Sequence, residues 1–444
     1  MRRVVSASRG QLTGITLVLG ITLLARGAPA QVRGTIFGPG AQTLPIALSP
    51  LKDQSGGGAG RSLATGFADI IRDDLVLTGI FRILPRDSYI EPVETSGMTA
   101  ETINFENWAV LGALALVKGT VQRDGDQLVV EARLFDVAQR RQLVGRRYRG
   151  TVNDLRRMAN KFADEIMAAL TGERGPFNSR ITFLSTRDGR FKDVYVTSVD
   201  GGDVRRITAN STLNLSPSWG PDVDTLLVTS YRPRKPELYG IDLSDRRWTP
   251  VAPSEAPTLN GRWSPDGHLL AVTREDQGNP EIFLVSRDGN VRRRLTQHWA
   301  IDVSPSWAPD GQRLTFCSSR SGAPQIYTVN AEGSDLRRVT LSGGYNTSPS
   351  WSPKGDRIAY VGRVGGRFQV FTVKVDGSDV RQVTNSAGDN EDPSWSPDGR
   401  FLVFSSTRAG RSRLYVADIS GTSQVELTHG NGDDTSPAWS RWLD

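Results

Sequence analysis

The chain has 444 residues, of which 37% are hydrophobic and 23% are charged, with 46 Gly and 24 Pro. This is an ordinary globular composition rich in turns, and the length is enough for two or three domains, so a largely disordered chain is excluded. Basic residues outnumber acidic ones by 54 to 48, but four of the arginines fall in the first thirty residues, which hold no acid. Without them the balance is 50 to 48, which is too even for a dedicated nucleic-acid binder.

The first thirty residues have the pattern of a secretory signal peptide. Arginines are followed by an apolar run from Leu12 to Leu24 and then by Ala28-Pro29-Ala30, a cleavage pattern that would make Gln31 the first mature residue. A membrane anchor is the alternative, but the apolar run is shorter than the roughly 20 residues that span a bilayer. The single cysteine, Cys317, leaves any exported fold without an internal disulfide.

Residues 45–171 are predicted to form a small α/β domain. A strand at 45–51 is followed by a Gly-rich bend, and the next segment has apolar residues at helical spacing. Asp124-Gly125-Asp126 is a good hairpin turn between two strands of a meander. The expected elements are strands at 45–51, 81–84, 113–121, 127–137 and 141–148, and helices after the bend, around 107–108 and at 153–170.

The segments that flank this domain are predicted to be irregular. Residues 31–44 contain three glycines and alternate only weakly, which predicts a mobile N-terminal arm, and residues 172–180 are the expected linker. The Gly-rich bend at 56–58 lacks the Gly-Lys-Ser/Thr ending of a phosphate-binding loop, so it is interpreted as a flexible turn. The sequence predicts no cofactor.

A 44-residue repeat dominates the rest of the chain. It is marked by six tryptophans: Trp219, Trp263, Trp307, Trp351, Trp395 and Trp439. Around them recurs Ser-Pro-Ser-Trp-x-Pro-Asp-Gly, complete at 304–311. Pro presets its backbone angle, Gly accepts a positive φ, and the indole can fill the wedge between twisted sheets, so the motif is interpreted as structural.

The pattern of each repeat predicts four strands, and four strands per unit of this length are typical of a propeller blade. The region 181–444 opens with the second strand of a unit and ends with a first strand at 436–440, so the C-terminal strand must complete the blade that the first repeat begins. Such closure removes two exposed sheet edges. The expected fold class is therefore an α/β N-terminal domain followed by an all-β six-bladed propeller closed by the C-terminal strand.

Two repeats depart from the pattern. The second carries Gly220-Pro-Asp-Val-Asp224, without the final Gly, and the third has Asn260-Gly261-Arg262 in place of Ser-Pro-Ser. The spacing of the tryptophans is unchanged. We therefore expect different turns in these two blades but the same number of blades.

Catalytic motifs are missing from the sequence. The three histidines are isolated, and no His-Glu-x-x-His, no Cys pair and no Gly-x-Ser-x-Gly occurs. The lack of these motifs argues against an enzyme and against a metal site of a known motif, and no catalytic residue is assigned.

A ring of small polar residues is predicted at the mouth of the central channel, five residues before each repeat tryptophan. We call these the mouth residues: Asn214, Thr258, Asp302, Asn346, Asn390 and Asp434. Asp302 and Asp434 are three repeats apart and are expected to face each other across the channel. Turn formation by Asn and Asp is one explanation, and recognition of a peptide or of a cation held between carboxylates is the other.

An arginine recurs on the same expected face of the propeller. We call this set the arginine crown: Arg187, Arg232, Arg274, Arg320, Arg363 and Arg408. A solvated set of charges is one explanation, but arginine is also favoured at protein interfaces.

This organisation resembles the TolB family of the Tol-Pal system over the whole chain. The export signal, the α/β domain and the six Trp-Ser-Pro-Asp-Gly-type repeats all match. Pro45-Ile-Ala-Leu48 with the Gly-rich bend resembles the start of the family's first domain, and Phe183-Leu-Ser-x-Arg187 with Ser436-Pro-Ala-Trp439 resembles its closing blade.

The resemblance implies a periplasmic protein without enzymatic activity. It implies binding of the peptidoglycan-associated lipoprotein Pal through the channel face, carried here by the mouth residues and the crown through their place in the repeat. It also implies contact with TolA through the arm, and other outer-membrane proteins as further partners, in support of outer-membrane integrity and of envelope constriction at cell division. The arm positions carried over for TolA are Val32, Arg33, Thr35, Ile36 and Phe37.

The resemblance implies neither nucleic-acid binding nor membrane insertion. A different class of function stays open from the residues alone. A propeller can be a periplasmic enzyme or a solute-binding protein that acts on a glycan or peptide in its channel, and Asp302 and Asp434 would then be its central residues.

Overall fold

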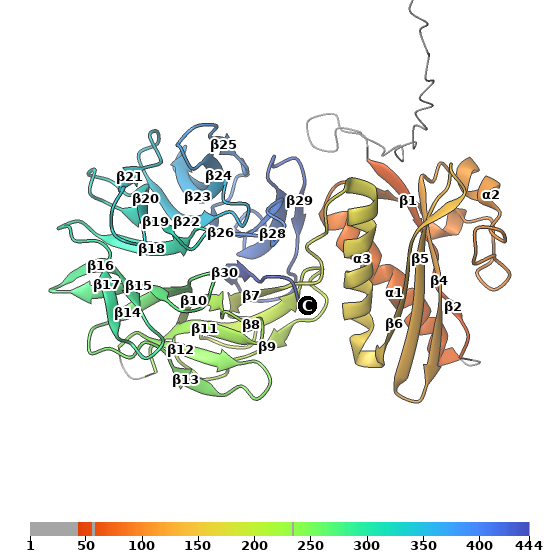
Figure 1. The fold of residues 1–444 in the computed structure, drawn as a ribbon, viewed down its shortest axis with the longest axis horizontal. Coiled ribbons are helices and arrows are strands. Elements are labelled where there is room, and N and C mark those ends of the chain that lie inside the picture. Colours follow the sequence, from red (N-terminus) through yellow and green to blue (C-terminus); the bar gives the residue numbers. More distant parts are fainter. Residues whose placement is uncertain (1–42, 56–57, 233–234, 444) are drawn as a thin grey trace, which may run out of the picture. The chain divides into compact units, whose positions relative to one another are not determined.

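The computed structural model describes residues 43–55, 58–232 and 235–443 (Figure 1). The predicted signal peptide and all but the last two residues of the predicted arm lie outside the described residues, as do Gly56 and Gly57 of the bend. The five arm positions assigned to TolA therefore lie there too.

One mixed sheet precedes the repeats. Its strands are β1 (Leu44–Leu48), β2 (Lys52–Asp53), β3 (Phe81–Ile83), β4 (Ala115–Asp124), β5 (Gln127–Asp136) and β6 (Arg141–Thr151). They are ordered β3-β1-β4-β5-β6, with β2 beside β4. β1 is parallel to β3 and β4, whereas β4, β5 and β6 form the predicted antiparallel meander with Gly125 at positive φ in its first turn.

Helices cover both faces of this sheet because its strands alternate. α1 (Gly58–Leu77) and α3 (Leu155–Thr171) share a core with Val117 and Leu134, while the neighbouring Leu116 and Phe135 pack on the other face with Trp108 of α2 (Phe105–Val110). Two 3₁₀ turns complete this part, η1 (Arg86–Ser88) and η2 (Val152–Asp154). An α/β fold is thus confirmed.

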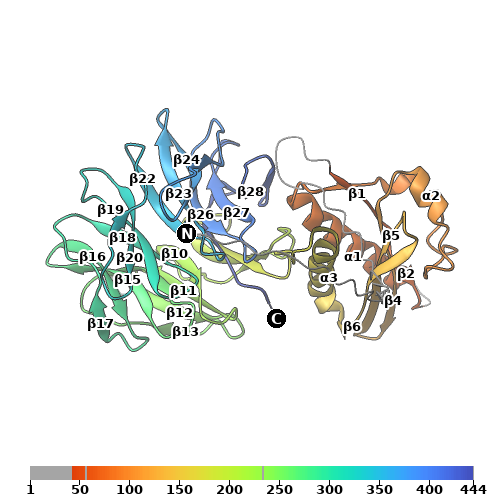
Figure 2. The ribbon, with the colours of Figure 1, turned by 45° about the horizontal axis from the view of Figure 1, so that its top comes forward.

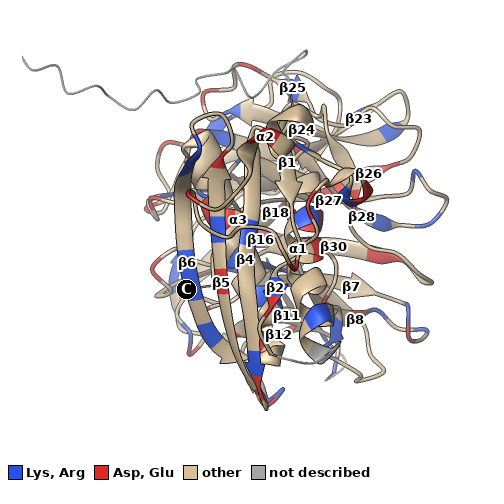
Figure 3. Ribbon diagram, turned by 90° about the vertical axis from the view of Figure 1, so that its right-hand side faces the viewer, with Lys and Arg blue, Asp and Glu red and all other residues tan. Residues whose placement is uncertain are grey.

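Specific residues define the two ends of α3 and protect the free edge of the sheet. Asp154 accepts hydrogen bonds of 2.8 Å from both the backbone N–H and the hydroxyl of Thr151, and Gly172 ends the helix at φ 82°. The edge strand β6 carries four arginines, visible along it in Figure 3. Such charges discourage pairing with another chain.

The repeat region forms six four-stranded antiparallel sheets. The blade made by both ends of the region consists of β30 (Asp434–Trp439), β7 (Arg180–Ser185), β8 (Asp193–Ser198) and β9 (Arg205–Arg206). Each of the other five blades consists of four strands that follow one another in the chain. Two of them are β10 (Asn214–Trp219), β11 (Thr225–Ser230), β12 (Glu237–Asp242) and β13 (Trp248–Pro250), and then β14 (Thr258–Trp263), β15 (Leu270–Asp276), β16 (Asn279–Val285) and β17 (Val291–Arg294). The next three are β18 (Asp302–Trp307), β19 (Arg313–Ser318), β20 (Gln325–Asn330) and β21 (Arg337–Arg338); β22 (Asn346–Trp351), β23 (Arg357–Val364), β24 (Arg367–Lys374) and β25 (Arg381–Gln382); and β26 (Asn390–Trp395), β27 (Phe401–Ser406), β28 (Arg413–Asp418) and β29 (Gln424–Glu426).

These sheets close into a ring (Figure 2). The first strand of each blade contacts the first strand of the next, and β30 contacts both β26 and β10. β30 pairs antiparallel with β7 through Asp434↔Ser185 and Trp439↔Ile181. The predicted six-bladed propeller, closed by its C-terminal strand, is therefore confirmed.

The repeated motif has the structural role that the sequence predicts. The tryptophans pack against the preceding blade, as Trp307 does in a core shared with Ile282 and Leu314. Several of their indoles also donate to that blade's backbone, such as Trp395 Nε1 to the Ser350 carbonyl at 2.9 Å. The Gly of Pro-Asp-Gly has positive φ in three blades, including Gly311, and so has Gly355 of Pro353-Lys354-Gly355 in a fourth.

Candidate functional site

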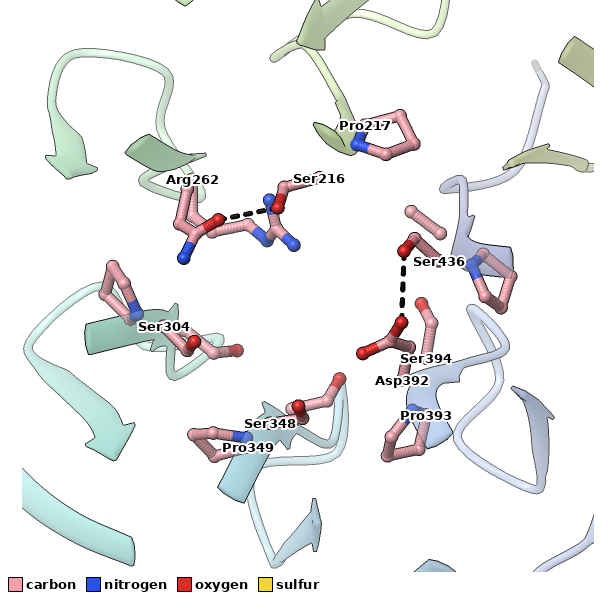
Figure 4. Close-up of a pocket in the computed structure, with 16 residues that line it drawn as sticks. Ser216, Pro217, Arg262, Ser304, Ser348, Pro349, Asp392, Pro393, Ser394 and Ser436 are labelled. Carbon is pink, nitrogen blue, oxygen red and sulfur yellow. Dashed lines mark hydrogen bonds between the residues drawn. The ribbon is translucent and has the colours of Figure 1, made fainter. Parts of the chain in front are cut away.

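A polar cavity of about 160 Å³ lies in the channel, where the innermost strands β10, β14, β18, β22, β26 and β30 converge (Figure 4). Each of these strands contributes the residues just before its tryptophan. We call the six polar residues that lie three positions before each repeat tryptophan the upper ring: Ser216, Asn260, Ser304, Ser348, Asp392 and Ser436. Prolines follow all of them except Asn260, so hydroxyls and rigid rings alternate along the wall.

The backbone is strained at every position of this ring. Each of the six residues has φ between 49° and 57°, a left-handed conformation that non-glycine residues seldom adopt, and the register of each strand against its neighbour shifts there. Asn260 has the same conformation as the serines, so the departure in the third repeat does not change the bulge. Strain of this kind persists where the surroundings over-determine it, and it clusters at functional sites.

Two charged residues point into the cavity, Arg262 from β14 and Asp392 from β26 (Figure 4). Two side-chain hydrogen bonds cross between neighbouring blades, from Ser216 to Asn260 at 2.6 Å and from Ser436 to Asp392 at 3.0 Å. The wall therefore offers hydroxyl donors, one carboxylate and one guanidinium.

A second cavity, of about 540 Å³, lies at the tryptophan ends of the same strands. All six repeat tryptophans line it, together with Arg441 and Trp442 of the C-terminal segment. Arg262 lines both cavities and is the one charged side chain that does so among the described residues.

The structure buries the predicted mouth residues at the starts of the innermost strands, with at most 3% of each exposed. They do not line the channel cavity. Asp302 and Asp434 do not face each other across the channel, because each binds an arginine of its own blade, Arg320 at 2.7 Å and Arg187 at 2.9 Å. That part of the prediction is wrong. Burial also raises the pKa of Asp302, although Arg320 lowers it.

The arginine crown belongs to the same repeated arrangement. Arg408 donates to Asn390 at 2.8 Å and lies 4.4 Å from the ring centre of Tyr415, and Arg274 is buried above Phe283. Arg232 and Arg363 are exposed. A binding role of the mouth residues and the crown stays a prediction, since their contacts within the fold are what the structure shows.

Two features of this face were missed by the sequence analysis. The first is the channel wall, because Ser-Pro-Ser was interpreted only as part of a structural motif in the strand that carries the tryptophan, and its spacing does not show which of its side chains face the channel. The second is a set of exposed apolar side chains beside the mouth residues, which we call the apolar rim: Trp299, Ile301, Leu341 and Tyr345, exposed by 78%, 50%, 72% and 37%. Isolated apolar residues in polar loops carry no periodicity that would reveal them.

The apolar rim and the crown share one end of the propeller. Ile301 and Tyr345 directly precede the mouth residues Asp302 and Asn346. The carbonyl of Tyr345 accepts a hydrogen bond of 3.1 Å from the backbone N–H of Arg363, which joins the loop before β22 to the end of β23. This end therefore presents apolar side chains next to exposed guanidinium groups, a composition typical of protein interfaces.

Within the described ranges, no group of three or more His, Cys, Asp or Glu side chains could hold a metal ion. The rings of His298 and Trp299 contact each other in a tilted arrangement with centroids 5.1 Å apart, and His429 contacts Glu426 at 3.1 Å. No helix in the described part of the chain is long and apolar enough to cross a membrane.

Comparison with protein families gives two matches. The model described as the TolB beta propeller domain matches residues 167–443, and the one described as the TolB amino-terminal domain matches residues 33–143.

Individual relatives agree with the family matches. The Tol-Pal system protein TolB of Syntrophotalea carbinolica is 40% identical over 208 residues, which is 47% of this chain and 48% of the relative. That of Anaeromyxobacter dehalogenans is 38% identical over 241 residues, 54% of each chain. The chain thus spans about half the length of the curated relatives it matches. The crystal structure of TolB from Acinetobacter baumannii superposes with a TM-score of 0.78 at 27% identity, covering 90% of this chain and 97% of that one.

Proposed function

Because the chain belongs to the TolB family, we propose that it is a non-enzymatic, periplasmic component of the Tol-Pal system that binds the lipoprotein Pal at the mouth end of its propeller. It would bind TolA through the arm at 31–44 and so support outer-membrane integrity and envelope constriction at cell division.

The apolar rim is the observation that carries this proposal. Large apolar side chains exposed together on one end of a protein favour a protein partner over a small solute. The exposed crown residues Arg232 and Arg363 would supply the polar edge of such an interface. The remaining crown arginines and the mouth residues would act mainly by holding the loops in place, because most of them bind one another.

The test is the affinity for the periplasmic part of Pal, measured by calorimetry on single variants. Trp299→Ala and Leu341→Ala should each weaken binding about fivefold or more, since truncating a large anchor residue at an interface costs over 1 kcal/mol. The matched control is Val291→Ala, because Val291 is an apolar side chain with 51% exposure on the outermost strand β17, away from the rim. Equal losses in all three variants, or none in the rim variants, would refute the docking face.

The arm is tested separately. Removal of residues 31–42 from the mature chain should abolish binding to TolA while leaving the affinity for Pal within about twofold. Retention of TolA binding by the shortened chain would show that the arm is not its contact.

A further inference from the structure

Arg262 breaks the pattern of the channel wall. At its place in the repeat the other blades carry small side chains: Ser218, Ser306, Ser350, Ser394 and Ala438. The bulge at Asn260 is the same as in the other blades, so the substitution changes the chemistry of the channel and not its backbone. Its guanidinium points into the cavity (Figure 4).

The charge of Arg262 is not balanced within the fold. Its one side-chain hydrogen bond among the described residues is to the carbonyl of Gly261, at 3.0 Å, and no carboxylate of that part of the chain forms an ion pair with it. Removal from water lowers the pKa of Arg262, and the charge of Asp392, three repeats away, only partly offsets this. A guanidinium held out of water without a partner is costly, and a bound counter-charge removes that cost.

Two hydroxyl groups of the same cavity wall as Arg262 have no hydrogen-bond partner in the described structure. Ser304 and Ser348 line the same cavity and point their side chains into it, and no other described side chain or backbone group binds their hydroxyls. Ser216 and Ser436, by contrast, donate to Asn260 and Asp392. The volume of about 160 Å³ exceeds the ~30 Å³ share of one water molecule several times, so a small ion with some of its water fits.

We propose that the channel binds a small anion with at least two acceptor oxygens, a carboxylate or an inorganic oxyanion, on Arg262 with the hydroxyls of Ser304 and Ser348. A planar guanidinium presents paired N–H donors that match such oxygens in a bidentate arrangement. Asp392 also lines the cavity and repels the anion, which weakens its binding. The site does not depend on a partner protein and is distinct from the rim.

The repeat supplies the variants that test this. Arg262→Ser restores the residue that most blades carry at that place, and Asp392→Ser does the same for the upper ring, so neither should disturb the fold. Phosphate, sulfate and acetate are titrated into the protein calorimetrically and in thermal unfolding, against sodium chloride at matched ionic strength.

The expected changes have opposite signs. Arg262→Ser should weaken binding of the probe anion at least tenfold, because a charged hydrogen bond is lost, and should abolish the anion-dependent rise in melting temperature. Asp392→Ser should strengthen binding severalfold by removing the repulsion. Unchanged affinity in Arg262→Ser, weaker affinity in Asp392→Ser, or no difference between the oxyanions and chloride would overturn the proposal.

A carboxylate can come from solution or from an acidic side chain of a bound protein. Repeating the titration with saturating Pal distinguishes these sources. This experiment is the only one of the set that rests on the proposed function. Unchanged binding of acetate assigns the site to a dissolved anion, and lost binding assigns it to a carboxylate of the partner. If Pal does not bind, the proposed function fails, but the titrations without Pal still test the anion site.

Discussion

Arg187 Nη2 lies 3.0 and 2.9 Å from the two carboxylate oxygens of Asp434, although the residues are 247 positions apart in the chain. Asp434 begins β30 and Arg187 follows β7, so this pair joins the two ends of the repeat region. Arg320 and Asp302 form the same pair inside one continuous blade, at 2.7 Å. The chain thus closes its ring with the contact it uses elsewhere within a blade.

Removing the carboxylate at the closure should destabilise the ring. Asp434→Ala leaves the largely buried Arg187 without its partner, and we expect a loss of about 3 kcal/mol in the free energy of unfolding. Asp302→Ala should cost less, because only one oxygen of Asp302 accepts a hydrogen bond in the described structure. Hydrogen exchange should rise in both β30 and β7 for the first variant, and only in β18 and β19 for the second.

The conservative replacement is the control for this pair. Asn390 occupies the same place in its repeat and accepts a hydrogen bond of 2.8 Å from Arg408, so Asp434→Asn should retain most of the stability. Exchange in β30 as fast for Asp434→Asn as for Asp434→Ala would show that the charge of Asp434, and not its hydrogen bond to Arg187, holds the closing strand.

The architecture was predictable because the repeat encodes it several times over. Six tryptophans at one spacing fix the number of blades, and the phase of the last motif fixes which strand closes the ring. The last motif lacks the strands that follow it in the other repeats, so Trp439 was expected beside the strand at the start of the repeat region. The register pairs Trp439 with Ile181 of that strand.

The site was less predictable because position in a repeat does not reveal which way a side chain points. Asp302 was expected in the channel, yet its strand turns it toward Arg320, and the bulge two residues later sends Ser304 inward instead. A register shift of this kind depends on the pairing with the next strand, which a single sequence does not show. Arg262 was noticed as a departure from the motif, but its chemical meaning required the cavity.

Two of the repeat tryptophans should respond differently to the same substitution. Trp395 Nε1 donates to the carbonyl of Ser350, whereas the buried Nε1 of Trp351 has no partner in the described structure. Replacement by Phe removes similar volume in both, so Trp395→Phe should cost about 1 kcal/mol more than Trp351→Phe. Urea unfolding of the two variants measures the difference, and a larger cost for Trp351→Phe would show that packing rather than hydrogen bonding decides it.

The stability of the protein should fall as the pH rises from 5 to 7, because of a carboxyl group buried in α3. Burial raises the pKa of Asp164 to about 7, although its hydrogen bonds from the backbone N–H groups of Phe177 and Asn178 lower it. The unfolded chain has its carboxyl pKa near ~4, so between these values the folded state holds a proton that the unfolded state has lost. Folding is therefore favoured at the acidic end of this window.

Asp164→Asn should flatten that slope, which is at most about 1.4 kcal/mol per pH unit for one group. Asp74 contributes in the same direction, since burial raises its pKa as well, so some slope should remain. Asp154→Asn, at the N-cap of the same helix, is the matched control: hydrogen bonds from Thr151 lower the pKa of Asp154, so its stabilisation is lost only in more acidic solution. That variant should lower stability through its cap yet keep the slope between pH 5 and 7. An unchanged slope in Asp164→Asn, measured by thermal unfolding across the window, would mean that Asp164 stays ionised in the folded protein.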